Sequence, residues 1–302
     1  MCIRDRSKKG LKAESGDIRG GMFLVLAEVA SRIAARFPRH QIVWKPDLLL
    51  PIEDPKASVG SLLFIRSITY PSGSLYSFSV KDKDIEEARK DLEYAIAPLR
   101  SENILVNSTI IEENNFLHGA KLVIQTLLGS AFRPNCIFLN VGSKKEKDEI
   151  IKKLVDYAGN NELGTLLLRQ HPRIAFGLQK DINLWLRDKS PNWHLAVLVS
   201  LQIQLNWGGK INLVTVANSK NDEARLYEFL NNISQQSRLP SLTEFNVLTG
   251  KFTDVLKEAP RADINIFGLG ETIDLNNLRN ITELAMSSCL FVKDSGNESA
   301  LV

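Results

Sequence analysis

Residues 134–142 read Pro-Asn-Cys-Ile-Phe-Leu-Asn-Val-Gly, and residues 262–270 read Ala-Asp-Ile-Asn-Ile-Phe-Gly-Leu-Gly. Each stretch is a short apolar run that ends in glycine, which is typical of a strand buried on both faces of a parallel sheet. The two stretches resemble each other although they lie in different halves of the chain. This resemblance favours an internal duplication. The alternative is that the two halves share an architecture without sharing an ancestor.

Similar runs recur along the rest of the chain and alternate with helical stretches. The predicted strands form two sets of five, namely residues 48–52, 75–80, 104–111, 136–141 and 163–168, and residues 182–186, 211–217, 245–248, 264–269 and 289–293. Alternating β and α segments are typical of βαβ units around a parallel sheet. We therefore predict an α/β protein of two tandem three-layer α/β sandwiches, each with a mostly parallel five-stranded sheet.

The predicted helices lie between these strands and show apolar residues every three or four positions. They are residues 84–99, 192–207, 222–236, 252–258 and 275–287, and a helix that runs to about residue 158. That last helix is preceded by Ser143 and Glu146, whose spacing predicts a capping box at its start.

An apolar segment precedes the first sandwich. Residues 18–37 have a spacing near that of a helix, and Pro38 ends the pattern. We predict an amphipathic connector helix within residues 15–43, a first α/β subdomain in residues 44–172 and a second in residues 173–302. The segment 1–14 is predicted to be a disordered start, and residues 1–6 back-translate into a transposase adapter used in sequencing. We therefore expect residues 1–6 to be an artefact and the natural chain to continue upstream of residue 7.

Composition excludes several classes of protein. The chain has 302 residues, of which 44% are hydrophobic and 24% charged, as in globular proteins. A net charge of +3 with only 7% aromatic residues argues against a nucleic-acid-binding surface. Three cysteines far apart in sequence favour a reducing compartment over a disulfide framework. The longest apolar run, residues 22–27, is much shorter than the roughly 20 residues of a membrane span.

Motifs for chemistry are incomplete. Gly268 and Gly270 follow a predicted strand, but Ile273 stands where a dinucleotide-binding loop needs its third glycine, so a tight turn is favoured over a phosphate cradle. His118 follows two glutamates and is either a base with an orienting carboxylate or, as we favour, a polar residue at a strand end. Asp148 and its neighbour Glu149 are predicted to lie on a solvated helix face. We predict no catalytic, cofactor-binding or metal-binding residue, and hence no enzyme.

Several short motifs follow one another in a recognisable order. They are residues 16–21 (Gly-Asp-Ile-Arg-Gly-Gly), 44–50 (Trp-Lys-Pro-Asp-Leu-Leu-Leu), 132–135 (Phe-Arg-Pro-Asn), 181–186 (Asp-Ile-Asn-Leu-Trp-Leu), 210–217 and 290–300. Their order and spacing resemble the cytosolic C-terminal region of cation-chloride cotransporters and their prokaryotic relatives, over residues 15–302.

This resemblance implies a domain that follows the last membrane helix of an amino acid/polyamine/organocation-type transporter, on the cytoplasmic face of the membrane. It implies two subdomains similar to the universal stress protein fold, a homodimer, and a regulatory role in contact with the chain's own transmembrane domain. No cofactor is implied. The connector residues that the resemblance assigns are Asp17, Arg19, Met22, Phe23, Val25 and Leu26.

Two alternatives stay open. One is a stand-alone nucleotide-binding module similar to universal stress proteins, whose glycine signature is echoed by Gly119, Gly129 and Ser130. In that echo Phe116 replaces the first glycine, and the stretch reads as a helix. The other alternative is an α/β enzyme whose site is assembled from loops.

Overall fold

A computed structural model of the protein describes residues 16–34, 44–55, 58–130, 133–188, 190 and 192–301, with side chains described from residue 20 to residue 33 in the first segment. It divides into two compact units, Met1–His40 and Gln41–Val302. The described part of the first unit is one helix, α1 (Gly16–Ala34), where residues 18–37 were predicted to be helical. The predicted adapter-derived and disordered start, residues 1–14, and residues 35–43 lie outside the described residues.

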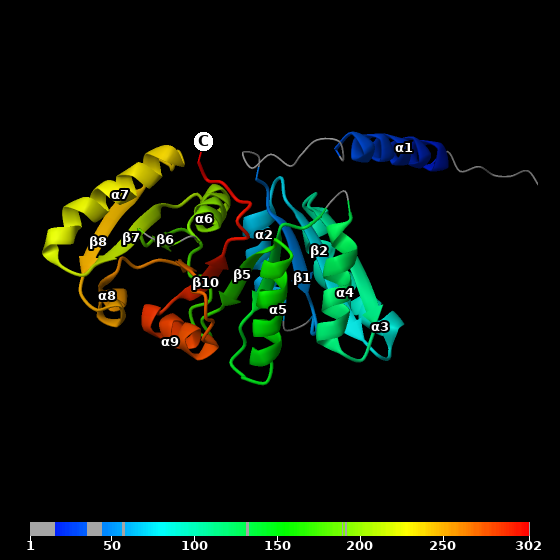
Figure 1. Cartoon of the computed structure of the whole chain (residues 1–302). Helices are drawn as coiled ribbons and strands as arrows, with labels where there is room; N and C mark the ends of the chain where they lie inside the picture. Colours follow the sequence, from blue (N-terminus) through cyan, green and yellow to red (C-terminus); the bar gives the residue numbers. More distant parts are fainter. Residues whose placement is uncertain are drawn as a thin grey trace, which may run out of the picture. The chain divides into compact units, whose positions relative to one another are not determined.

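The second unit is an α/β fold (Figure 1). Its strands are β1 (Asp47–Pro51), β2 (Ser74–Lys81), β3 (Leu105–Glu112), β4 (Cys136–Asn140), β5 (Gly164–Arg169), β6 (Ile182–Trp185), β7 (Ile211–Ala217), β8 (Glu244–Thr249), β9 (Ile264–Gly268) and β10 (Ser288–Lys293). Its helices are α2 (Val59–Thr69), α3 (Ile85–Ser101), α4 (Phe116–Leu128), α5 (Asp148–Asn160), α6 (His194–Trp207), the short η2 (Lys220–Asp222), α7 (Glu223–Gln236), α8 (Phe252–Glu258) and α9 (Leu275–Ala285). Every predicted strand is confirmed to within one residue at either end.

The strands form one ten-stranded sheet in the order β3-β2-β1-β4-β5-β10-β9-β6-β7-β8. Within each half the order is third, second, first, fourth, fifth, and all pairs within a half are parallel. The halves meet where β5 and β10 pair antiparallel, with Leu167 opposite Phe291. The predicted α/β class and mostly parallel sheets are confirmed, and the structure shows in addition that the two five-stranded sets join edge to edge.

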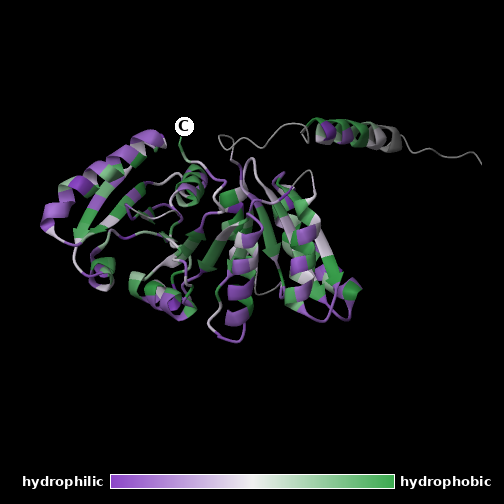
Figure 2. Ribbon diagram, in the orientation of Figure 1, coloured by the Kyte–Doolittle hydropathy of each residue, from purple (hydrophilic) through white to green (hydrophobic). Residues whose placement is uncertain are grey.

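Helices cover both faces of this sheet and produce three layers. One hydrophobic core joins the sheet to α2, α3, α6 and α7, and the other joins it to α4, α5, α8 and α9. Successive strand residues point to opposite faces, so Leu48 and Leu50 lie in the first core and Leu49 in the second. This double burial explains why the central strands are mostly apolar, as the largely green strands in Figure 2 show.

Two expectations about helices differ from the structure. The prediction of a capping box at Ser143 and Glu146 was wrong. Helix α5 begins at Asp148, and the side chain of its N-cap residue, Lys147, makes no capping hydrogen bond. Ser143 instead accepts a hydrogen bond from Arg169 Nη2 at 3.3 Å, so the turn before α5 serves a long-range contact. Helix α2 was not among the predicted helices, and its buried Ser61 and Ser67 interrupt the apolar pattern that would have indicated it.

Candidate functional site

The predicted connector residues lie on α1, whose apolar side chains are exposed. Met22, Phe23, Val25 and Leu26 are each more than half exposed. Leu24 is 72% exposed as well, so the exposed apolar residues 22–26 are not confined to one face of the helix. Among the described residues of the first unit, α1 has no second element to pack against.

Asp17 and Arg19 lie in the first turn of α1, and their side chains are outside the described residues.

Among the described residues, no helix combines the length and the hydropathy of a membrane span.

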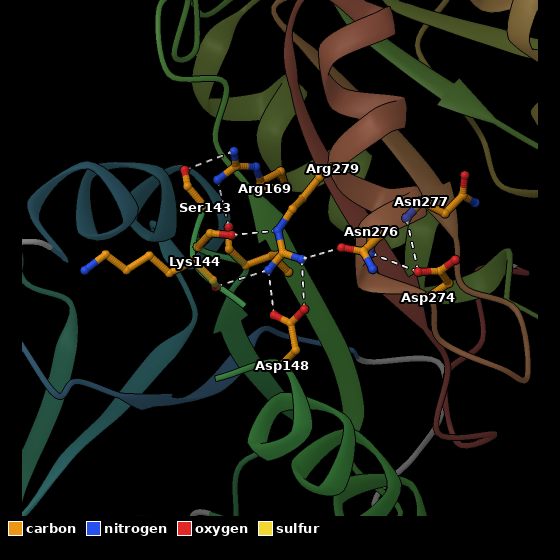
Figure 3. Close-up of polar contacts among 10 residues, drawn as sticks. Ser143, Lys144, Asp148, Arg169, Asp274, Asn276, Asn277 and Arg279 are labelled. Atoms are coloured by element: carbon orange, nitrogen blue, oxygen red, sulfur yellow. Dashed lines mark hydrogen bonds and ion pairs between the residues drawn. The ribbon is translucent and has the colours of Figure 1, made fainter. Parts of the chain in front are cut away.

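The two halves of the second unit are joined by an arginine that comes from α9. Arg279 donates from Nη2 to Asp148 Oδ1 at 2.5 Å and from Nη1 to Asp148 Oδ2 at 2.8 Å, which is the bidentate geometry of a strong ion pair (Figure 3). Its Nε donates to the Gly142 carbonyl at 2.9 Å, and Nη2 also reaches the Lys144 carbonyl at 3.3 Å. Only 11% of the Arg279 side chain and 18% of the Asp148 side chain are exposed. The second half therefore holds the loop that follows β4 in the first half.

Hydrogen bonding to Arg279 lowers the pKa of the Asp148 carboxyl, and the same bonds raise the pKa of Arg279. Both groups are therefore charged over the physiological range of pH, and the ion pair persists across it.

A second arginine reaches the same loop from β5. Arg169 is buried, and it donates from Nη1 to the Val141 carbonyl at 3.1 Å in addition to its bond to Ser143. Burial, and then repulsion from Arg279, lowers the pKa of Arg169. Two guanidinium groups thus converge on one loop, where carbonyl oxygens and one carboxylate compensate their charge (Figure 3).

The segment between the halves is tied to β10. The His171 amide donates to Ser288 Oγ at 2.9 Å, and the amides of Arg173 and Ile174 donate to His171 Nδ1 at 3.3 and 3.2 Å. Because Nδ1 accepts these bonds, the neutral imidazole carries its proton on Nε2, which lies 3.8 Å from Glu283 Oε2 on α9. We call Asp148, Arg169, His171, Arg279 and Glu283 the junction cluster.

The prediction for Asp148 was wrong, since it is a mostly buried partner of Arg279 rather than a solvated residue. The junction cluster was missed because Arg279 and Asp148 lie 131 positions apart in sequence. No local pattern marks such a pair.

We expect Arg279→Ala to lower the free energy of unfolding by about 2–3 kcal/mol, because it leaves a mostly buried carboxylate without its bidentate partner. Urea denaturation followed by circular dichroism measures the change. The matched control is Lys153→Ala on α5, which removes an exposed ion pair with Glu149 and is expected to cost less than about 0.5 kcal/mol. Equal stability of the two variants would contradict a structural role for the Arg279 ion pair.

The C-terminal segment carries a second group with an unusual environment. Asp294 Oδ2 accepts a hydrogen bond from the Leu195 amide at 3.4 Å at the start of α6, while Oδ1 is buried without a hydrogen-bond partner in the described part of the chain. Burial, followed by repulsion from Glu298, raises the pKa of Asp294 to about 7. Burial also lowers the pKa of the neighbouring His194, whose Nδ1 accepts from the Ala300 amide at 3.2 Å. The carboxyl of Asp294 therefore titrates close to neutral pH.

A raised folded-state pKa means that folding favours the protonated carboxyl, so the contribution of Asp294 to stability is lost as pH rises from about 4 to about 7. We expect Asp294→Asn to be more stable than the wild type at pH 8, with the difference shrinking towards pH 4. Urea unfolding across this pH range provides the measurement, with the exposed Asp82→Asn as the control for the chemical change. A variant less stable than the wild type at pH 8 would show that the charged form of Asp294 is not disfavoured.

The glycine positions singled out in the sequence divide into two kinds. Gly119 lies in α4, where an added Cβ would come within 2.9 Å of the Val80 side chain, so this glycine permits close helix–strand packing. Gly268 ends β9, and Gly270 lies in the turn that follows it, which borders a cavity.

His118 does meet Glu113, with Nδ1 2.8 Å from Oε2, and this contact lowers the pKa of Glu113. The His118 side chain is 60% exposed at the first turn of α4, where Asn115 caps the helix. This position fits the favoured reading of polar residues between a strand and a helix.

Comparisons with known proteins agree on one family. The family model of the prokaryotic cation-chloride cotransporter, C-terminal domain, 1st, matches residues 50–176, and the model of the 2nd such domain matches residues 177–301. A crystal structure of the cytoplasmic domain of a prokaryotic cation chloride cotransporter is 30% identical, with a TM-score of 0.76 over 85% of this chain and 98% of that one. No curated protein sequence matches.

More distant solved structures share the fold alone. A protein of unknown function from Pseudomonas aeruginosa PAO1 is 15% identical with a TM-score of 0.54, over 84% of this chain and 94% of that one. A universal stress protein from Archaeoglobus fulgidus DSM 4304 is 11% identical with a TM-score of 0.51, over 83% of this chain and 97% of that one. The predicted likeness of the fold to universal stress proteins is thereby confirmed.

Proposed function

This chain belongs to the family of prokaryotic cation-chloride cotransporter C-terminal domains, and we propose that it is the non-catalytic cytoplasmic domain that regulates and dimerises its parent transporter. The observation that carries the proposal is the exposed apolar surface of α1. An apolar surface of this kind is stable in water only against a partner, and the transmembrane part of the parent protein is the partner that the family supplies.

Within this proposal α1 is the connector. Its residues Met22, Phe23, Val25 and Leu26 pack against the transmembrane part, and Asp17 and Arg19 lie where the helix leaves the membrane. The second unit then regulates the transmembrane part through α1, a helix of 19 residues.

We also propose that the second unit contains two subdomains, residues 44–172 and residues 173–302. The two matching family models meet at residues 176 and 177, which supports a division in this region. The repeated strand order of the two halves supports it as well.

We expect the genomic sequence upstream of codon 7 to encode hydrophobic helices of about 20 residues each.

The transmembrane part, expressed by itself, is expected to bind this chain in a pull-down. Phe23→Ser/Leu26→Ser is expected to weaken that binding at least about tenfold, because it places two hydroxyls in an apolar contact. The control is Arg32→Ala on the same helix, which alters only an exposed ion pair with Glu28. An upstream stop codon without membrane helices would contradict the proposal.

Dimerisation is tested on the chain alone. We expect sedimentation equilibrium at high micromolar concentration to report twice the 33.8 kDa mass of the chain. The measurement is repeated on the parent transporter in detergent, because the membrane part raises the local concentration of the domains. A monomer in both preparations would contradict the dimerisation part of the proposal.

A further inference from the structure

The segment that follows β10, residues 294–301, contacts both halves of the second unit. On α6 of the second half, His194 Nδ1 accepts a hydrogen bond from the Ala300 amide at 3.2 Å, and Ala300 belongs to the first hydrophobic core. On β5 of the first half, Glu298 Oε1 lies 2.9 Å from the position that a Cβ on Gly164 would occupy. Gly164 therefore leaves room for a carboxylate that comes from the other half. We call residues 294–301 the latch segment.

Two carboxylates of the latch segment are withdrawn from solvent. Glu298 is 8% exposed and accepts hydrogen bonds from the amide and the hydroxyl of Ser295, each at 2.9 Å. Asp294 Oδ2 accepts a long hydrogen bond from the Leu195 amide at 3.4 Å. Asp294 Oδ1 is buried and has no hydrogen-bond partner among the described residues. A charge on Asp294 is therefore poorly compensated by hydrogen bonds.

The surroundings of Asp294 also oppose a negative charge. Burial, followed by repulsion from Glu298, raises the pKa of Asp294 to about 7. Hydrogen bonds from the amides of Leu195 and His194 act in the opposite direction but have a smaller effect. Burial lowers the pKa of the His194 imidazole, so this neighbour carries no positive charge at neutral pH that could offset the carboxylate.

The other ionisable groups around Asp294 come from β1, β4 and β10. On β4, burial, followed by repulsion from nearby carboxylates, raises the pKa of Cys136 well above its usual value, so the thiol is neutral. Asp47 on β1 is one of those carboxylates, and it is paired with Lys45 at 2.9 Å. Lys293 at the end of β10 directs its ammonium group towards the end of α5. None of these described groups provides a positive charge that stabilises the Asp294 carboxylate.

From this arrangement we propose that the latch segment is a pH-sensitive switch, which is closed on α6 and β5 when Asp294 is protonated and opens more often when Asp294 is ionised. The ten-stranded sheet stays intact in the open state. Cys136 Sγ lies 3.1 Å from the same Cβ position of Gly164 that Glu298 approaches, so departure of the latch segment uncovers this thiol. The switch goes beyond the proposed function, because it is a property of this chain alone and needs neither the membrane part nor a dimer.

The effect of pH on the latch segment has a defined sign. Closing raises the pKa of Asp294 from 3.8 to about 7, so the stability gained from the protonated carboxyl is complete below about pH 4 and is lost as pH rises to about 7. Between pH 6 and pH 8 this linkage increases the opening equilibrium about tenfold. Protonation of His194 Nδ1 removes the acceptor of the Ala300 amide, so this second titration opens the segment on the acid side.

Labelling of the full chain with N-ethylmaleimide at pH 6 and pH 8 tests the proposal, with mass spectrometry of peptides to assign the label to Cys136 or Cys289. The ratio of the Cys136 labelling rate in the wild type to that in Asp294→Asn is expected to rise about tenfold from pH 6 to pH 8, because asparagine cannot ionise. The reactivity of the exposed thiol and the titration of His194 are common to both proteins and cancel in this ratio. Cys289 is buried in the second core, and it is expected to be labelled more slowly than Cys136 because it requires opening of β10.

The matched control is Asp82→Asn, which changes an exposed aspartate in the first half and is expected to leave the ratio of wild type to variant the same at both pH values. Hydrogen exchange of the Ala300 amide in the wild type keeps the test valid if Asp294→Asn does not fold. Divided by the intrinsic exchange rate, it is expected to rise at least about threefold from pH 6 to pH 8. The proposal is overturned if neither the Cys136 ratio nor the Ala300 exchange rises, if Cys289 is labelled as fast as Cys136, or if Asp82→Asn behaves like Asp294→Asn.

Discussion

The antiparallel pairing of β5 with β10 removes two sheet edges at once. A five-stranded parallel sheet that ended at β5 would present a row of unpaired amides and carbonyls, and its fully buried apolar side chains would require cover on both faces. In this protein the edge strand of one half covers that of the other. Because this pairing is antiparallel, the first five strands run in the opposite direction to the second five. The carboxyl ends of the two sets therefore lie at opposite ends of the strands.

The consequences of that geometry are visible in the two loops that follow β4 and β9. In the first half, carbonyl groups of this loop accept hydrogen bonds from Arg169 of the same half and from Arg279 of the second half. The loop is therefore in direct contact with α9. In the second half the turn that follows β9 borders a cavity, whose lining carries three carboxylates and three cations, namely Asp188, Asp222, Asp274, Arg187, Arg225 and Lys251. A continuous sheet and two packed cores connect the two loops.

Most of the fold could be predicted because its strands are buried on both faces. A run such as residues 136–141 is apolar at nearly every position, and neither its length nor its flanking glycine fits a helix. The pairing of β5 with β10 could not be predicted, since any two apolar edge strands satisfy the same local rules. Helix α2 was missed because two of its buried residues, Ser61 and Ser67, are polar and interrupt the apolar pattern. Their hydroxyl groups are buried in hydrogen bonds with Asn140 and Trp207. The assignment of Asp148 to solvent failed because its partner is contributed by α9.

The two halves behave as one body because β5 and β10 join them. Native-state hydrogen exchange of the backbone amides measures this directly, because it reports the free energy of opening at each strand. We expect the amides of Leu167 and Phe291 to exchange only through global unfolding, with the same free energy as those of the central strands β1 and β6. Faster exchange at β5 and β10 than at β1 and β6 would show that the halves separate while each stays folded, and would contradict the account.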